Sequence, residues 1–188
     1  MSKVVIAGDA SGTGTFTISA PNGNTDRTLV LPDEAGTVAL TSQLYTQGPA
    51  FAAYMSAPQG YTSGVWTKMV FDTEHFDTDS CYDTSVYRFT PTKAGIYQVT
   101  ANGTSSSGTG NYFYITLHKN GTRYGGLSGM YIASTNLNDD MYESYTCLMS
   151  LNGTTDYVEA YGIGNISGAT FGGFANETLF SAVWIRSN

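Results

Sequence analysis

The chain has 188 residues, of which 41% are hydrophobic and only 12% are charged, and its formal net charge is −7. Eight basic residues are too few to neutralise a phosphate backbone or to bind an anionic bilayer, which excludes nucleic-acid and membrane-surface partners. No run approaches the ~20 apolar residues of a spanning helix, and the first residues are too poor in apolar side chains for a signal peptide, so we expect assembly in a cytoplasm.

Residues 1–44 form a region of their own, because they contain no Trp and no Tyr. Alternating side chains predict three short strands, separated by turns rich in Pro, Asn and Gly: residues 15–20, 27–32 and 37–40. Three strands of this length bury too little apolar surface to be stable alone. They therefore need a partner surface, most simply identical copies of themselves, and residues 45–48 then form a linker.

Part of this region resembles a segment that recurs in the tail-fibre and other virion-fibre proteins of bacteriophages. The resemblance rests on three stretches: Gly14–Pro21, Arg27–Pro32 and Gly36–Ser42. In that family such a segment is a short shaft or an anchor that joins a distal head to the virion. The resemblance implies that residues 1–44 attach to another virion protein through the side chains that alternate along these strands: Phe16, Ile18, Leu29, Leu31 and Val38.

Residues 49–188 predict roughly ten short strands, with turn signals between them and no helical periodicity. The cleanest strand covers residues 111–118, in which Phe113, Ile115 and Leu117 point to one side. This pattern predicts an all-β sandwich, most simply a jelly roll.

Turn residues mark the ends of several strands in this region. Pro91 cannot donate to a ladder, so a strand should stop before it, and Lys93–Gly95 predicts a turn into a second strand. The Asn-Gly pairs at 120–121 and 152–153 predict tight turns. We expect three long, exposed loops that are rich in Gly, Ser and Asn: residues 101–110, 131–140 and 164–175.

The same region resembles the globular head of complement component C1q, of the C1q and tumour-necrosis-factor superfamily. The resemblance covers residues 50–186 and is carried mainly by four stretches: Arg88–Val99, Leu117–Gly121, Leu151–Val158 and Phe180–Val183. It implies a ten-stranded jelly roll that trimerises about a threefold axis and binds ligands at its apex or sides. Ala182 stands where that pattern has Gly. No collagen tract precedes the head, which argues against an animal complement protein.

Tyrosine is unusually frequent, with 14 residues. Tyr112 and Tyr114 alternate with Phe113, so they lie on the side of the strand away from the core. An exposed aromatic patch is unfavourable in a monomer, so we predict that it forms the threefold interface, together with Tyr97, Tyr157 and Tyr161. A charge at position 114 is then expected to yield monomers. The alternative is that these tyrosines are ordinary half-buried strand residues.

An acidic stretch raises the question of calcium, since hard cations prefer carboxylate oxygens. The candidate ligands are Asp72, Asp77, Asp79 and Asp83. Their spacing fits no calcium-loop motif, so the simpler interpretation is a solvated loop in which Asp favours turns. No other cofactor is indicated.

The sequence contains no catalytic motif, so we expect no enzymatic activity. Its two histidines, His75 and His118, lack recognisable partners for catalysis or metal binding. Its two cysteines, Cys81 and Cys147, are too few for a disulfide scaffold and are expected to be free thiols, with a single bridge between them as the alternative.

These observations together predict a homotrimeric structural protein of a phage virion fibre. The head is expected to adhere to the host-cell surface, with a glycan as the receptor, while the N-terminal region attaches to the virion. The candidate contact loops are residues 101–110, 131–140 and 164–175; the alternative is that these loops are solvent-facing spacers. The alternative is a capsid-decorating head fibre with a purely structural role and no dedicated receptor.

Overall fold

The computed structural model describes most of the head and short parts of the N-terminal region: residues 11–15, 17, 22–26, 28, 48–106, 108–110, 112–131, 136–137, 140–166, 168–172 and 177–188. The chain divides into two units, Met1–Ala39 and Leu40–Asn188. Within 1–44 the described residues contain no strand, and they bend at 22–25, where the sequence predicts a turn. The five predicted attachment residues and linker residues 45–47 lie outside the described residues, so those predictions stand as they were made.

The described part of the head is built entirely of antiparallel strands, fifteen in number, and contains no helix that could cross a bilayer. Eight strands have five or more residues: β1 (Ala50–Tyr54), β4 (Thr73–Asp77), β7 (Gly95–Ser105), β9 (Tyr112–Lys119), β10 (Thr122–Tyr131), β12 (Met141–Leu151), β13 (Val158–Gly164) and β15 (Leu179–Arg186). Seven have two residues: β2 (Gln59–Gly60), β3 (Thr67–Lys68), β5 (Tyr82–Asp83), β6 (Arg88–Phe89), β8 (Gly108–Thr109), β11 (Asn136–Leu137) and β14 (Thr170–Phe171).

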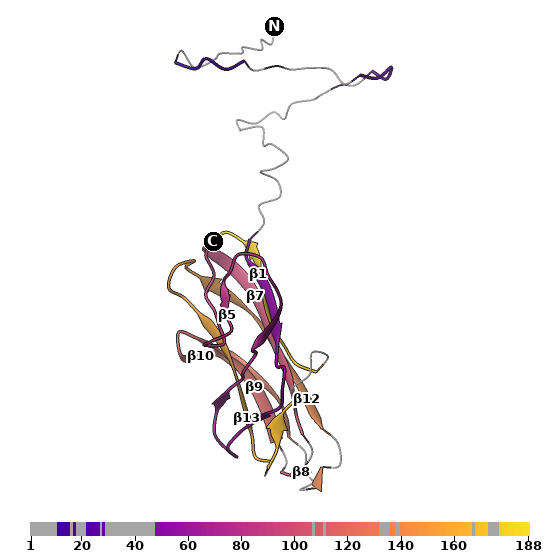
Figure 1. Cartoon of the computed structure of the whole chain (residues 1–188), viewed down its shortest axis with the longest axis vertical. Coiled ribbons are helices and arrows are strands. Elements are labelled where there is room, and N and C mark those ends of the chain that lie inside the picture. Colours follow the sequence, from indigo (N-terminus) through magenta and orange to yellow (C-terminus); the bar gives the residue numbers. More distant parts are fainter. Residues whose placement is uncertain are drawn as a thin grey trace. The chain divides into compact units, whose positions relative to one another are not determined.

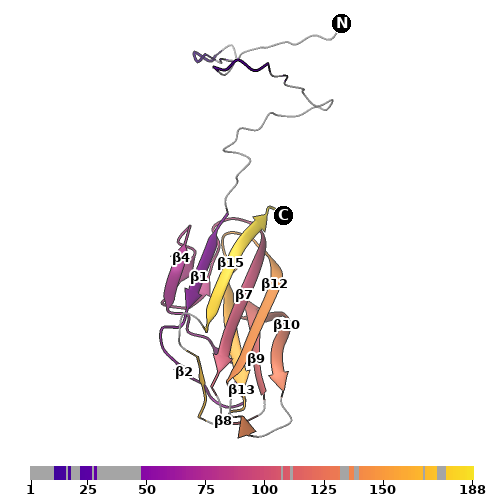
Figure 2. The same ribbon diagram turned by 90° about the vertical axis from the view of Figure 1, so that its right-hand side faces the viewer.

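Two sheets face each other to form a sandwich (Figures 1 and 2). In the seven-stranded sheet, β12, β7, β15, β1 and β4 lie side by side. Strand β14 pairs with the last residue of β7, and β2 pairs with β14. In the six-stranded sheet the order is β10, β9, β13, β6 and β5, with β3 also paired to β13. Strands β8 and β11 form a small separate pair. The first strand of the head and the C-terminus lie at the same end of the sandwich, opposite β8 (Figure 1).

The hydrophobic core lies between the two sheets, as the alternation in the sequence predicts. Phe113, Ile115 and Leu117 of β9 have no exposed surface. At the centre, the ring of Phe51 stacks on Tyr82 at 4.5 Å and on Phe89 at 4.7 Å between ring centroids. Phe51 comes from the seven-stranded sheet and the other two from the six-stranded sheet, so these rings hold the two sheets together.

The stretch from Arg88 to Val99 connects the two sheets and is not a hairpin within one sheet. Strand β6 ends before Pro91 and belongs to the six-stranded sheet, whereas β7 belongs to the seven-stranded sheet. The corner is tight, because Gly95 has φ +155° and a Cβ there would collide with the backbone oxygen of Arg186. The alternation in this stretch is real, but it does not indicate which sheet each strand joins.

Both Asn-Gly pairs form the predicted turns. Asn120 and Gly121 have φ of +52° and +76° and connect β9 to β10 in a hairpin. At the second turn the Asn152 Oδ1 atom accepts hydrogen bonds from the backbone N–H groups of Thr154, Thr155 and Asp156, at 2.9–3.0 Å. The side chains also connect the two turns, since Asn120 Nδ2 donates to Asp156 Oδ1 at 2.8 Å.

Two of the three predicted exposed loops are wrong in part. In the loop predicted at 164–175, Ile166, Ala169 and Phe171 are buried in the core, and β14 pairs with the end of β7. The loop predicted at 101–110 is wrong in its first half. Residues 101–105 continue β7 and pair with β12 as far as Met141 opposite Ser105. The Gly and Ser residues there favour turns in isolation, but a complete partner strand satisfies their backbone groups and overrides that preference. The acidic stretch likewise contains two strands, β4 and β5.

Candidate functional site

The structure separates Tyr97 from the other four tyrosines predicted at a subunit interface. The Tyr97 side chain has no exposed surface and lies in the core, edge-on to Phe89 at 5.6 Å between ring centroids. Its hydroxyl donates to the backbone oxygen of Lys93 at 2.6 Å, and burial raises its pKa. A side chain enclosed in this way cannot contact another subunit, so the prediction for Tyr97 is wrong.

Tyr112, Tyr114, Tyr157 and Tyr161 do share one surface, the side of the six-stranded sheet that points away from the core. We call this surface the tyrosine face. Strand register places Tyr161 opposite Thr116 and Ile163 opposite Tyr114, so these side chains point the same way. All four tyrosines are half-buried. The sequence therefore predicts their common location correctly, and their role is a separate question.

A buried carboxylate organises the charged part of the tyrosine face. The Glu159 side chain is only 3% exposed. Its Oε1 atom accepts hydrogen bonds from Lys68 Nζ at 2.7 Å and from Arg88 Nε and Nη2 at 3.1 and 2.9 Å. Burial alone would raise the pKa of Glu159, but these donors outweigh it and hold the pKa below its ordinary value. Glu159 therefore fixes both cations in place.

The aromatic rings of the tyrosine face pack against one another or against cations. Tyr112 stacks on Tyr114 with a centroid distance of 5.3 Å, and His118 stacks on Tyr161 at 4.0 Å. The Arg88 guanidinium lies 3.7 Å from the centre of the Tyr157 ring. Each ring thus has a fixed orientation in the isolated subunit.

The opposite surface of the sandwich has a different character, which the sequence interpretation missed. On β7, β12 and β15 the alternating side chains that point away from the core are uncharged: Ile96, Gln98, Thr100, Asn102, Tyr142, Ser144, Thr146, Leu148, Ser150, Leu179, Ser181, Val183 and Ile185. The exception is Arg186 at the end of β15, which an irregularity in the pairing places opposite Ile96. We call this surface the apolar face. Leu148, Val183 and Ile185 are 58%, 46% and 47% exposed. The sequence does contain three series of alternating residues without charge, one in each of these strands. Only the strand pairing shows that the three series lie on one surface.

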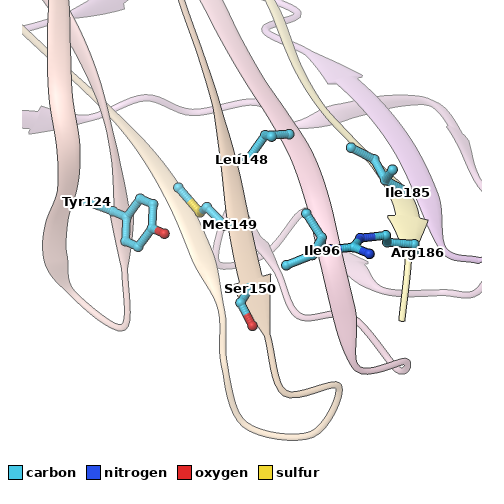
Figure 3. A pocket seen from close by; sticks show the side chains of 7 residues that line it. All are labelled: Ile96, Tyr124, Leu148, Met149, Ser150, Ile185 and Arg186. Atoms are coloured by element: carbon cyan, nitrogen blue, oxygen red, sulfur yellow. The ribbon is translucent and has the colours of Figure 1, made fainter. Parts of the chain in front are cut away.

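The apolar face is hollowed near the end of β15. A depression of about 420 Å³ is lined by Ile96, Tyr124, Leu148, Met149, Ser150, Ile185 and Arg186. Figure 3 shows that these side chains come from four strands, β7, β10, β12 and β15. A second depression, of about 240 Å³, lies farther along the same face, beside Phe76 and Val183. The face is therefore uneven and able to receive side chains of a partner.

The acidic stretch does not gather its carboxylates around a cation. Asp72 accepts hydrogen bonds from Ser56, and Asp83 from Ser85. Asp77 accepts from the backbone N–H of Tyr82 at 2.7 Å and from the Cys81 thiol. Among the described residues, no three His, Cys, Asp or Glu side chains come together as a metal site requires. These aspartates act in local turns.

Both cysteines are free, as predicted. Burial, followed by the neighbouring Asp77, raises the pKa of the Cys81 thiol, and burial also raises that of Cys147. Neither thiol has the electropositive setting of a reactive cysteine.

No protein-family model matches the sequence, and a search of curated proteins found no relative. Solved structures of similar fold do exist. The globular domain of zebrafish complement 1qA aligns with a TM-score of 0.56 and 15% identity, over 76% of this chain and all of that one. Murine APRIL gives 0.55 and 8%, over 74% of this chain and all of that one. Eiger, a TNF from S. frugiperda, gives 0.51 and 14%, over 74% and 95%. The head is therefore a C1q/TNF-like β-sandwich, the fold that the sequence resemblance implies.

Proposed function

We propose that the chain is a homotrimeric structural protein of a bacteriophage virion fibre, with an adhesive and not an enzymatic role. In this proposal the C-terminal head binds the host-cell surface, and residues 1–44 attach to another virion protein. The protein would assemble in the host cytoplasm and become part of the virion. The observation that carries the self-association is the apolar face, on which Leu148, Val183 and Ile185 are exposed.

Self-association through the apolar face agrees with what is known of subunit interfaces. Their buried centres are depleted of charged side chains, and exposed apolar patches on a soluble protein mark contact surfaces. In a chain of net charge −7, a sheet face without acidic side chains also avoids repulsion between the carboxylates of identical copies. The sequence resemblance to C1q and tumour-necrosis-factor proteins implies three copies about one axis.

The tyrosine face is the less favourable place for that contact. Burying it between subunits would desolvate Lys68 and Arg88, which are 28% and 35% exposed, and desolvating charges is costly even when they are paired. Its aromatic rings already pack against partners within one subunit. We therefore assign the subunit contact to the apolar face and revise the role of Tyr112, Tyr114, Tyr157 and Tyr161.

The alternative function is a capsid-decorating head fibre without a receptor. In either case the N-terminal region, with its resemblance to fibre segments, supplies the attachment.

Two measurements test the proposal. Sedimentation of the full chain should give three times the mass of one subunit, 20.1 kDa; a monomer would refute the assembly. Electron microscopy of virions decorated with antibodies against the head should show label at the tail, and the purified chain should bind host cells in a separate binding assay. Label on the capsid without cell binding would establish the decorating alternative.

A further inference from the structure

We propose that the tyrosine face is the receptor site of the head and that it binds an acidic saccharide, a chain of sugars bearing carboxylate groups. This inference rests on the proposed adhesive function and names its site and ligand class. It places the site on the outer surface of β10, β9, β13, β3 and β6, and not in the loops 101–110, 131–140 and 164–175. The side chains involved are Lys68, Arg88, His118, Arg123, Tyr157 and Tyr161.

The first argument is the distribution of charge. Residues 48–188 contain six Lys or Arg against eleven Asp or Glu, yet three of those six, Lys68, Arg88 and Arg123, lie on the tyrosine face. Arg123 is exposed and pairs with His118 across β10 and β9. The acids on this face are Glu159, which Lys68 and Arg88 share, and Asp83, opposite Arg88. Although the head as a whole is acidic, the tyrosine face therefore presents cations, and these are complementary to an anionic ligand.

The second argument is the aromatic content of the same surface. Tyr157 and Tyr161 stand one on each side of Glu159 along the strand, and both are half-buried. Tyrosine offers rigid contact area for the C–H faces of sugar rings, while its hydroxyl bonds to sugar hydroxyls. Charged side chains beside the rings would bond the carboxylates more strongly than neutral donors. Rings and cations alternating within one cluster fit a carboxylated sugar better than a neutral one.

The third argument is rigidity. Because Glu159 is almost fully buried, it holds Lys68 and Arg88 in one position, and Arg88 in turn covers the Tyr157 ring at 3.7 Å. His118 packs on Tyr161 at 4.0 Å. A site whose side chains are already ordered loses little conformational entropy when it binds. Self-association through the apolar face, on the other sheet, leaves this surface open to solvent in every copy.

The test uses the full chain and three probes: an alginate hexasaccharide, which carries a carboxylate on every sugar, neutral maltohexaose, and hexaglutamate, which has carboxylates without sugars. Calorimetry should detect binding of the alginate probe alone. Arg123→Gln and Tyr161→Ala should each weaken that binding about tenfold. Lys93→Gln is the matched control, because Lys93 lies against Trp184 of the other sheet and its loss removes the same charge.

Several results would overturn the inference. Equal affinity for maltohexaose would show that the site does not recognise carboxylates. Equal affinity for hexaglutamate would show that it recognises negative charge without recognising sugar. No binding of the alginate probe, or an equal loss with Lys93→Gln, would also refute it. Arg123 is exposed, so Arg123→Gln tests the site even if Tyr161→Ala fails to fold. Adhesion to host cells that is insensitive to both variants would refute this site but leave the adhesive function standing. Alginate binding without adhesion to host cells would refute the adhesive function but leave the saccharide site standing.

Discussion

Leu148 and Val183 lie on either side of Gln98, because β12 and β15 both pair with β7 at that residue. Two exposed apolar side chains from strands 35 positions apart in sequence are thereby placed on one surface, with no charge between them. This arrangement is the centre of the apolar face and leads to the most direct prediction about assembly.

We predict that Leu148→Asp converts the proposed trimer into monomers. The substitution places a carboxylate among the exposed apolar side chains of the proposed contact, where all three copies would have to bury it. Light scattering of the purified chain measures the result. Tyr114→Asp is the matched control on the tyrosine face and should leave the trimer intact. Monomers from Tyr114→Asp, with a trimer retained by Leu148→Asp, would restore the interface that the tyrosine pattern first predicts.

Replacing Glu159 by Gln should lower the free energy of unfolding by about 3 kcal/mol at pH 7, because two cations lose their buried partner. Denaturant unfolding measures the loss. Glu74→Gln, at an exposed position of β4, should change stability by less than about 0.5 kcal/mol. A loss at Glu159 no larger than at Glu74 would show that the cluster contributes nothing to stability.

The same variant predicts a pH dependence. The folded-state pKa of Glu159 lies below its ordinary value of about 4.3. Its ionised form therefore stabilises the fold fully above that value, and this contribution is lost as the pH falls through the lower, folded-state pKa. The stability difference between the wild type and Glu159→Gln should be constant above about pH 5 and shrink below about pH 4. Unfolding curves across this range test it, and a constant difference would contradict it.

Asn152→Ala should destabilise the head by about 1–2 kcal/mol, because the Asn152 side chain caps three backbone N–H groups of its turn. Asn152→Asp keeps the acceptor oxygen and should retain most of the stability. Chemical denaturation of both variants separates the hydrogen bonds from other effects of the substitution. Equal losses in the two variants would mean that the acceptor is not what stabilises the turn.

Phe51→Ala should cost about 4 kcal/mol, as expected when a large aromatic side chain is removed from a packed core. The ring has no exposed surface and contacts Tyr82, Phe89 and Phe180, so its removal leaves a cavity between the two sheets. Phe51→Leu should cost less, because it refills part of that volume. Thermal unfolding of the two variants gives the order, and the reverse order would contradict the packing.

Local patterns in the sequence were sufficient for much of the fold. Phe113, Ile115 and Leu117 had to share one side of a strand, and they fill the core. The Asn-Gly pairs had few conformations other than tight turns open to them, and both are turns. These predictions succeeded because each depends on neighbours along the chain.

Predictions that depend on pairing between distant strands were harder. The alternation around Tyr97 shows that it faces opposite to Ile96, but two apolar neighbours do not reveal which of them faces the core. Which sheet β7 joins was equally hidden, because pairing with β12 and β15 is decided by residues about 45 and 85 positions later. The apolar face combines side chains from three strands in this way, so it appears as one surface only in the folded head.

The position of β1 has a mechanical consequence. This strand begins the head, lies between β4 and β15, and is held at its start by the Trp184 N–H, which donates to the Pro49 oxygen at 3.0 Å. A pull on residue 48, resisted by a ligand held farther along the sandwich, would act along β1 and across two ladders at once. Many hydrogen bonds would then have to break together and not one after another. The head is thus connected in a way that resists a tensile load applied through residue 48.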